Sequence, residues 1–187
     1  MRYKAVVMGA SAGGFSALST VLTVLPADFA APVIIVQHMS PDSDNYVVRT
    51  LNGCCRIRVK EADEKEKAVP GVVYIAPPNY HLMIEEDTTL SLSTGKRVRN
   101  SRPSIDVLFE TAAEAYGAGL IGVILTGSNN DGSRGLSRIK SEGGLAVVQD
   151  PETAEADEMP GAAIAMVDVD NILPLSEIGP FLCKIIR

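Results

Sequence analysis

Short β-branched runs alternate along this chain with glycine-rich or polar turns and with helical patterns. Tyr3–Met8 and Val33–Gln37 are mostly apolar runs of the kind found in strands covered on both faces, as in parallel sheets. Between them, Phe15–Leu25 repeats apolar residues on one helical face, and Pro26 ends that pattern. Alternating strands and helices predict an α/β fold, with a doubly wound, mainly parallel sheet and helices on both faces.

The same patterns continue through the rest of the chain. Further strands are predicted at 56–60, 71–76, 120–125 and 145–149, and further helices at 45–51, 104–116, 132–142 and 178–186. The runs 81–85 and 89–93 alternate in character around Glu86-Asp87-Thr88, which predicts an attached antiparallel hairpin. Residues 1–187 suffice for one well-packed domain and are few for two, so we expect a single domain.

Charge and cysteine content exclude several classes of function. The formal charge of −6 argues against a nucleic-acid partner, because such proteins normally present a basic face to phosphate. The local cluster of Lys96, Arg97, Arg99 and Arg102 is either a solvated loop or a contact for an acidic protein surface. No run approaches the ~20 apolar residues of a membrane span, and no signal peptide is recognisable. The three cysteines have neither disulfide nor zinc spacing, which predicts reduced thiols and a cytoplasmic protein.

A glycine-rich turn, Gly9-Ala10-Ser11-Ala12-Gly13-Gly14, follows the first predicted strand. Such a turn could cradle a dinucleotide phosphate, but that fingerprint needs glycine where Ser11 stands and an acid where the second strand ends in Gln37-His38. The other interpretation is a nucleophile elbow, in which small neighbours let a sharp turn project the Ser11 hydroxyl. A serine at this point is also a common helix N-cap. The turn favours a nucleophile over a dinucleotide site and leaves a structural role open.

His38 and Asp131 also fall at the ends of predicted strands. His38 comes near Ser11 if the first two strands are neighbours, and it could then act as the general base. Asp131 follows the strand 120–125 and could orient the imidazole, although it could equally be the N-cap of the next helix. The other histidine, His81, lies in the hairpin and is expected to be structural. Three such residues at one edge of the sheet predict a Ser11–His38–Asp131 triad.

These residues stand within a wider likeness, because the chain resembles the catalytic domain of the chemotaxis protein-glutamate methylesterases (CheB type). The likeness runs from about Val6 to Ile186 and rests on six ordered blocks. The blocks are Gly9–Gly14, Val36–Met39, Val73–Pro77, Arg102–Phe109, Leu125–Gly127 with Asp131-Gly132, and Gln149–Ala154 with Met159-Pro160. By this resemblance the family's triad falls on Ser11, His38 and Asp131.

The resemblance implies a serine hydrolase that removes γ-methyl esters from glutamates of methyl-accepting chemoreceptors and releases methanol. It also implies deamidation of particular receptor glutamines, with no metal or other cofactor. Backbone N–H groups of Ala12 and Ser128 are the expected oxyanion donors, with Gly13 in the same substrate-facing loop. Residues 1–187 would then be the catalytic domain without a receiver domain, and a receiver domain acting in trans is a candidate partner.

The chain departs from the family pattern in two places. Ala12 stands where threonine commonly follows the nucleophile, and Ser128-Asn129-Asn130 replaces the usual Met-Gly-x before Asp131. Losing that methionine removes an apolar wall beside the ester. Two alternatives therefore stay open, namely a hydrolase of the same fold acting on another ester or amide, and a catalytically silent module that docks on receptors.

Overall fold

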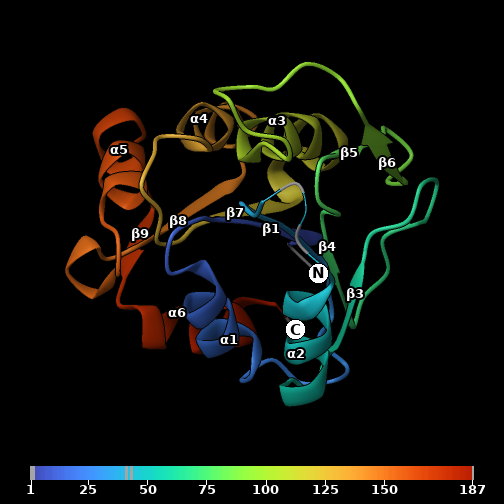
Figure 1. Ribbon diagram of the computed structural model, residues 1–187. Helices are drawn as coiled ribbons and strands as arrows, with labels where there is room; N and C mark the ends of the chain where they lie inside the picture. Colours follow the sequence, from blue (N-terminus) through green and yellow to red (C-terminus); the bar gives the residue numbers. More distant parts are fainter. Residues whose placement is uncertain (1–2, 41, 43, 187) are drawn as a thin grey trace.

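The computed structural model describes residues 3–40, 42 and 44–186, and these form a sheet with helices on both faces (Figure 1). Seven parallel strands follow the order β3-β4-β2-β1-β7-β8-β9. Their bounds are β1 (Ala5–Ala10), β2 (Val33–Gln37), β3 (Arg58–Glu61), β4 (Val72–Ile75), β7 (Leu120–Ile124), β8 (Leu145–Gln149) and β9 (Asn171–Leu173). A separate antiparallel hairpin pairs β5 (His81–Ile84) with β6 (Leu90–Ser93). The predicted fold class is confirmed.

The helices lie in two layers, one on each face of the sheet (Figure 1). One layer contains α1 (Gly14–Leu22), α2 (Tyr46–Cys54) and α6 (Leu175–Ile185), and the other contains α3 (Ile105–Tyr116), α4 (Ser133–Ser141) and α5 (Glu158–Met166). Two short 3₁₀ turns, η1 (Gly117–Gly119) and η2 (Pro151–Thr153), precede β7 and follow β8.

Each central strand is apolar up to its carboxyl end, where β2 and β8 finish in Gln37 and Gln149, because both of its faces are covered. In β1, Val6 and Met8 join the core under α1 and α6, whereas Ala5 and Val7 join the core under α3 and α4. Successive side chains of a strand point to opposite faces, so a strand buried on both sides favours apolar residues at successive positions. The continuous runs in the sequence therefore mark the middle of the sheet.

One helix and one strand lie outside the predicted elements. The sequence predicts no helix between the strand 145–149 and the helix 178–186, but Glu158 begins α5. Pro160 is compatible with this helix because it lies in the first turn, where the N–H groups have no helical acceptor. The edge strand β9 is only three residues long and partly exposed, so it leaves little periodic signal in the sequence.

The strand order places a topological switch beside β1. From β1 the chain moves outward through β2 on one side, and later through β7 and β8 on the other. In open α/β sheets the crevice beyond the carboxyl ends of strands at such a switch is the usual place for a site. The turns that follow β1, β2 and β7 meet there.

Candidate active site

Ser11 and His38 are adjacent because β1 and β2 pair in register. Ala10 is the register partner of Gln37, and the His38 N–H donates to the Ala10 carbonyl at 2.9 Å. The next residue on each strand is therefore Ser11 or His38, on backbones about 4.8 Å apart. The side chain of His38 is 13% exposed, so it is accessible from the crevice.

Gln37 fixes these two turns to each other. Its Nε2 donates to the backbone carbonyls of Ser11 and His38, both at 2.9 Å. The side chain is buried, and its Oε1 has no partner among the described residues. Sequence reasoning gave Gln37 no role of its own, although a polar residue that ends an apolar strand was a usable signal.

Asp131 lies in the turn between β7 and α4, and its carboxylate reaches the N-terminus of α3, where it faces His38. Its Oδ2 accepts from His38 Nε2 at 2.9 Å and from the Ile105 N–H at 2.7 Å. Its Oδ1 accepts from the Ser104 hydroxyl and the Asp106 N–H, both at 3.0 Å. The alternative expected for Asp131, capping the helix that follows it, is wrong. The carboxylate instead caps a helix that lies 25 residues earlier in the chain.

These donors keep Asp131 ionised. Its carboxyl is 1% exposed, and burial alone would raise its pKa. The hydrogen bonds from His38 and from the backbone N–H groups of Asp106 and Ile105 outweigh burial, so the pKa lies below its ordinary value. Because a carboxylate only accepts, the proton of neutral His38 resides on Nε2, and Nδ1 is the atom with a free lone pair.

The Ser11 hydroxyl is not yet joined to this pair. Within the described residues, Ser11 Oγ has no hydrogen-bond partner, whereas His38 Nδ1 is contacted by Asn129 Nδ2 at 3.3 Å. The structure thus brings His38 and Asp131 into direct contact and places Ser11 beside them without a side-chain bond. Catalytic hydrogen bonds are often long or absent in unliganded enzymes, so this geometry is compatible with a resting triad.

The turn after β7 packs closely behind Ser11. Thr126 Oγ1 lies 2.9 Å from the Ala12 carbonyl oxygen, and a Cβ added at Gly127 would lie 3.0 Å from Ser11 Cβ. The same added Cβ would lie 2.6 Å from Met159 Cε. Glycine at this position therefore allows the close approach of β7's turn to the candidate nucleophile.

The predicted oxyanion donors have free backbone N–H groups. Among the described residues, the N–H groups of Ala12, Gly13 and Ser128 have no acceptor. The Ser11 carbonyl is held by Gln37, so the N–H of Ala12 in the same trans peptide points the opposite way. These three donors are available to a ligand, and their role in binding an oxyanion stays a prediction.

A small hollow of about 90 Å³ opens beside His38. Its lining includes Met39, Arg97 and residues 100–103, and so two residues of the basic cluster, Arg97 and Arg102. Arg99 Nε pairs with Asp106 at 3.2 Å, and Arg102 donates to Asn79 and to two backbone carbonyls. Arg97 also donates to the Asn100 carbonyl at 3.4 Å, so three of the four basic residues bond to the protein itself, although Lys96, Arg97 and Arg99 are exposed.

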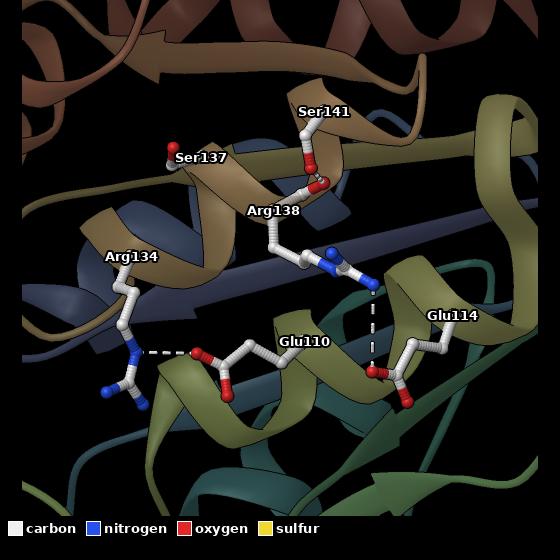
Figure 2. Close-up of a pocket in the computed structure, with 6 residues that line it drawn as sticks. All are labelled: Glu110, Glu114, Arg134, Ser137, Arg138 and Ser141. Atoms are coloured by element: carbon white, nitrogen blue, oxygen red, sulfur yellow. Dashed lines mark hydrogen bonds and ion pairs between the residues drawn. The ribbon is translucent and has the colours of Figure 1, made fainter.

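A larger hollow of about 330 Å³ lies between α3 and α4 and has a different character (Figure 2). Arg134 pairs with Glu110 at 2.6 Å across the two helices, and Arg138 approaches Glu114 at 4.0 Å. The residues that line it are Glu110, Glu114, Arg134, Ser137, Arg138 and Ser141. This lining has matched charges and includes no histidine or cysteine, so it lacks the chemistry found at the carboxyl edge of the sheet.

His81 and Asp150 have structural roles. His81 is buried, with Nε2 3.0 Å from the Lys96 carbonyl and Nδ1 accepting from the Ser104 N–H, as expected for a structural histidine. Asp150 accepts from the Glu152 N–H and initiates η2. Among the described residues, no group of three or more His, Cys, Asp or Glu side chains could hold a metal ion. In the same part of the chain, none of the helices combines the length and apolar character needed to cross a bilayer.

A family model described as CheB methylesterase matches residues 6–182. The chain belongs to the CheB methylesterase family. The expected family and enzyme class, a carboxylic ester hydrolase, are thereby confirmed. The match spans β1 through most of α6, and so includes every element that carries a candidate site residue.

Individual proteins show how similar this CheB methylesterase chain is to other members and how much of each it covers. It is 55% identical over 185 residues to a putative protein-glutamate methylesterase/protein-glutamine glutaminase of Leptospira interrogans, and covers 96% of that relative. It is 43% identical to a protein-glutamate methylesterase/protein-glutamine glutaminase of Burkholderia pseudomallei but spans only 49% of it. The CheB methylesterase catalytic domain of Thermotoga maritima superposes with a TM-score of 0.94 at 34% identity, covering 99% of this chain and 100% of that one.

Proposed function

We propose that this protein hydrolyses γ-glutamyl methyl esters on methyl-accepting chemoreceptors, with Ser11 as nucleophile, His38 as general base and Asp131 as its orienting carboxylate. The observation that carries this proposal is the 2.9 Å contact between His38 and a buried, ionised Asp131, on the turn beside Ser11. We further propose that residues 1–187 act as one catalytic domain in the cytoplasm. A receiver domain acting in trans stays a prediction.

The tautomer of His38 decides which ring nitrogen acts as the base. His38 Nδ1 accepts the Ser11 proton as Oγ attacks the ester carbonyl, and Asp131 stabilises the imidazolium through Nε2. The tetrahedral intermediate places its negative oxygen toward the free N–H groups of Ala12 and Ser128. The C–O bond to the methoxy group then breaks, and methanol leaves with the proton from Nδ1. Water, deprotonated by the same nitrogen, hydrolyses the acyl-enzyme to glutamate.

The same steps release ammonia when the substrate is a glutamine side chain. General base catalysis typically contributes about 10²–10⁴-fold, and each oxyanion donor about 2.7–4 kcal/mol. No step uses a metal or a redox cofactor. A single site thus supports both activities that the names of its relatives join, methylesterase and glutaminase.

The function is tested by offering the protein two kinds of ester. Purified protein is incubated with membranes carrying receptors labelled on their methyl esters, and volatile labelled methanol is measured; a small activated ester is tested in parallel. Methanol release from receptors supports the proposal. Hydrolysis of the small ester alone would favour a same-fold hydrolase with another substrate, and receptor binding without either reaction would favour a silent docking module.

A further inference from the structure

The side-chain amide of Asn129 bridges the backbone of Asp131 and the imidazole of His38. Asn129 Oδ1 accepts from the Asp131 N–H at 2.9 Å, and Nδ2 lies 3.3 Å from His38 Nδ1. The first bond fixes the orientation of the amide, because a backbone N–H requires an oxygen acceptor. The atom presented to His38 is therefore the amino group, a hydrogen-bond donor.

This contact occupies the lone pair that Ser11 needs. His38 Nε2 donates to Asp131, so Nδ1 is the one ring nitrogen with a lone pair that could accept the serine proton. That lone pair accepts from Asn129. We propose that Asn129 is a positioning residue that competes with Ser11 for His38 Nδ1, so that the resting triad stays open until a docked substrate displaces the amide. This proposal rests on the proposed function of the site.

The chemistry of the reaction also requires the displacement. When His38 takes the serine proton, Nδ1 becomes a donor, and the Asn129 amino group facing it is a donor as well. Two facing donors repel, so the amide must leave before the imidazolium forms. Asn129 is only half-buried and both of its sequence neighbours are exposed, which leaves room for that movement.

The contact is a property of this side chain. Glycine at this position would have no group able to reach His38, whereas asparagine spans the distance and is anchored by the Asp131 N–H. Replacing a neutral hydrogen bond of this kind shifts an equilibrium by about fivefold. Ser11 reactivity toward a small reagent should therefore rise by that factor when the Asn129 amino group is removed.

Two substitutions separate competition from loop support. Asn129→Ala removes both hydrogen bonds, whereas Asn129→Ser keeps a short oxygen acceptor for the Asp131 N–H but cannot reach His38. Asn130→Ala is the matched control, because Asn130 Oδ1 bonds Arg99 and not the imidazole. The rate of fluorophosphonate labelling of Ser11 is followed by mass spectrometry, with Ser11→Ala as the unlabelled reference.

Competition predicts that labelling accelerates about fivefold in both Asn129 variants and stays within about twofold of wild type in Asn130→Ala. For receptor hydrolysis it predicts a lower KM with nearly unchanged kcat in Asn129→Ser, because displacement is then no longer part of binding. Slower labelling in Asn129→Ala that Asn129→Ser restores to wild type would overturn the proposal and assign Asn129 a structural role; equal rates would also overturn it. If wild-type Ser11 is not labelled at all, the proposed function fails with it.

Discussion

The side chain of Asp131, which precedes α4, caps α3, and the side chain of Asp106, which lies in α3, caps α4. The Asp131 carboxylate accepts the Asp106 N–H at the start of α3, and Asp106 Oδ1 accepts the N–H groups of Gly132 and Gly135 at the start of α4. Both carboxylates are buried, and each satisfies donors that a helix start leaves unpaired. The candidate orienting acid is thereby fixed by two helices at once, which holds His38 in place.

Removing the charge of Asp131 should lower activity more than stability. In Asp131→Asn the amide nitrogen can donate but cannot accept, so it loses the hydrogen bonds on the side that it faces. Those bonds come either from His38 and Ile105 or from Ser104 and Asp106. We expect kcat to fall by about 10²–10⁴-fold and the free energy of unfolding by about 1–3 kcal/mol. Steady-state kinetics and urea unfolding measure the two effects.

Asp150→Asn is the matched control, because asparagine caps as well as aspartate there and the site is not involved. If Asp131→Asn retained wild-type kcat, the orienting role of Asp131 would be excluded.

Acid should reveal the ionisation of Asp131. Its folded-state pKa is lowered, so its contribution to stability is present above the ordinary aspartate value of about 3.9 and is lost as pH falls through the folded-state pKa. Between about pH 5 and pH 3, the unfolding free energy of wild type should therefore fall more steeply than that of Asp131→Asn. Urea titrations at each pH give both slopes, and parallel slopes would contradict the hydrogen-bonded, ionised carboxylate.

A methyl group at Gly127 should disturb the candidate nucleophile. In Gly127→Ala the new Cβ would lie 3.0 Å from Ser11 Cβ, which cannot move without its backbone, whereas Met159 Cε is the flexible end of its side chain. We expect kcat/KM to fall by about 10–100-fold and stability by about 1–3 kcal/mol. Gly161→Ala is the control, because nothing lies within 4 Å of its added Cβ. Unchanged kcat/KM in Gly127→Ala would show that the Ser11 position is not critical.

Thiol reagents should leave activity intact. Burial, and secondarily the neighbouring Cys54, raises the pKa of Cys55 to about 12, and burial raises the pKa of Cys183. Both thiols are therefore protonated at neutral pH and react slowly with alkylating agents. Treatment with iodoacetamide at pH 7 should modify mainly the exposed Cys54 without loss of methanol release. Inactivation that follows the extent of alkylation would implicate a cysteine instead of Ser11.

The sequence was most informative where local patterns decide the structure. Runs such as Val33–Gln37 become strands because both faces are buried, and strand ends place Ser11 and His38 side by side. Contacts between segments that are distant in the chain could not be predicted from local sequence patterns. The capping of α3 by Asp131 and the approach of Asn129 to His38 depend on how β7's turn packs against α3, and neither follows from spacing along the chain.

The central claim is that Ser11 attacks a receptor methyl ester with the help of His38. The most direct measurement compares methanol release from methyl-labelled receptor membranes by wild type, Ser11→Ala and the exposed neighbouring substitution Ser16→Ala. We predict release by wild type and Ser16→Ala, and background release by Ser11→Ala with an unchanged unfolding transition. Equal release by wild type and Ser11→Ala would contradict the account.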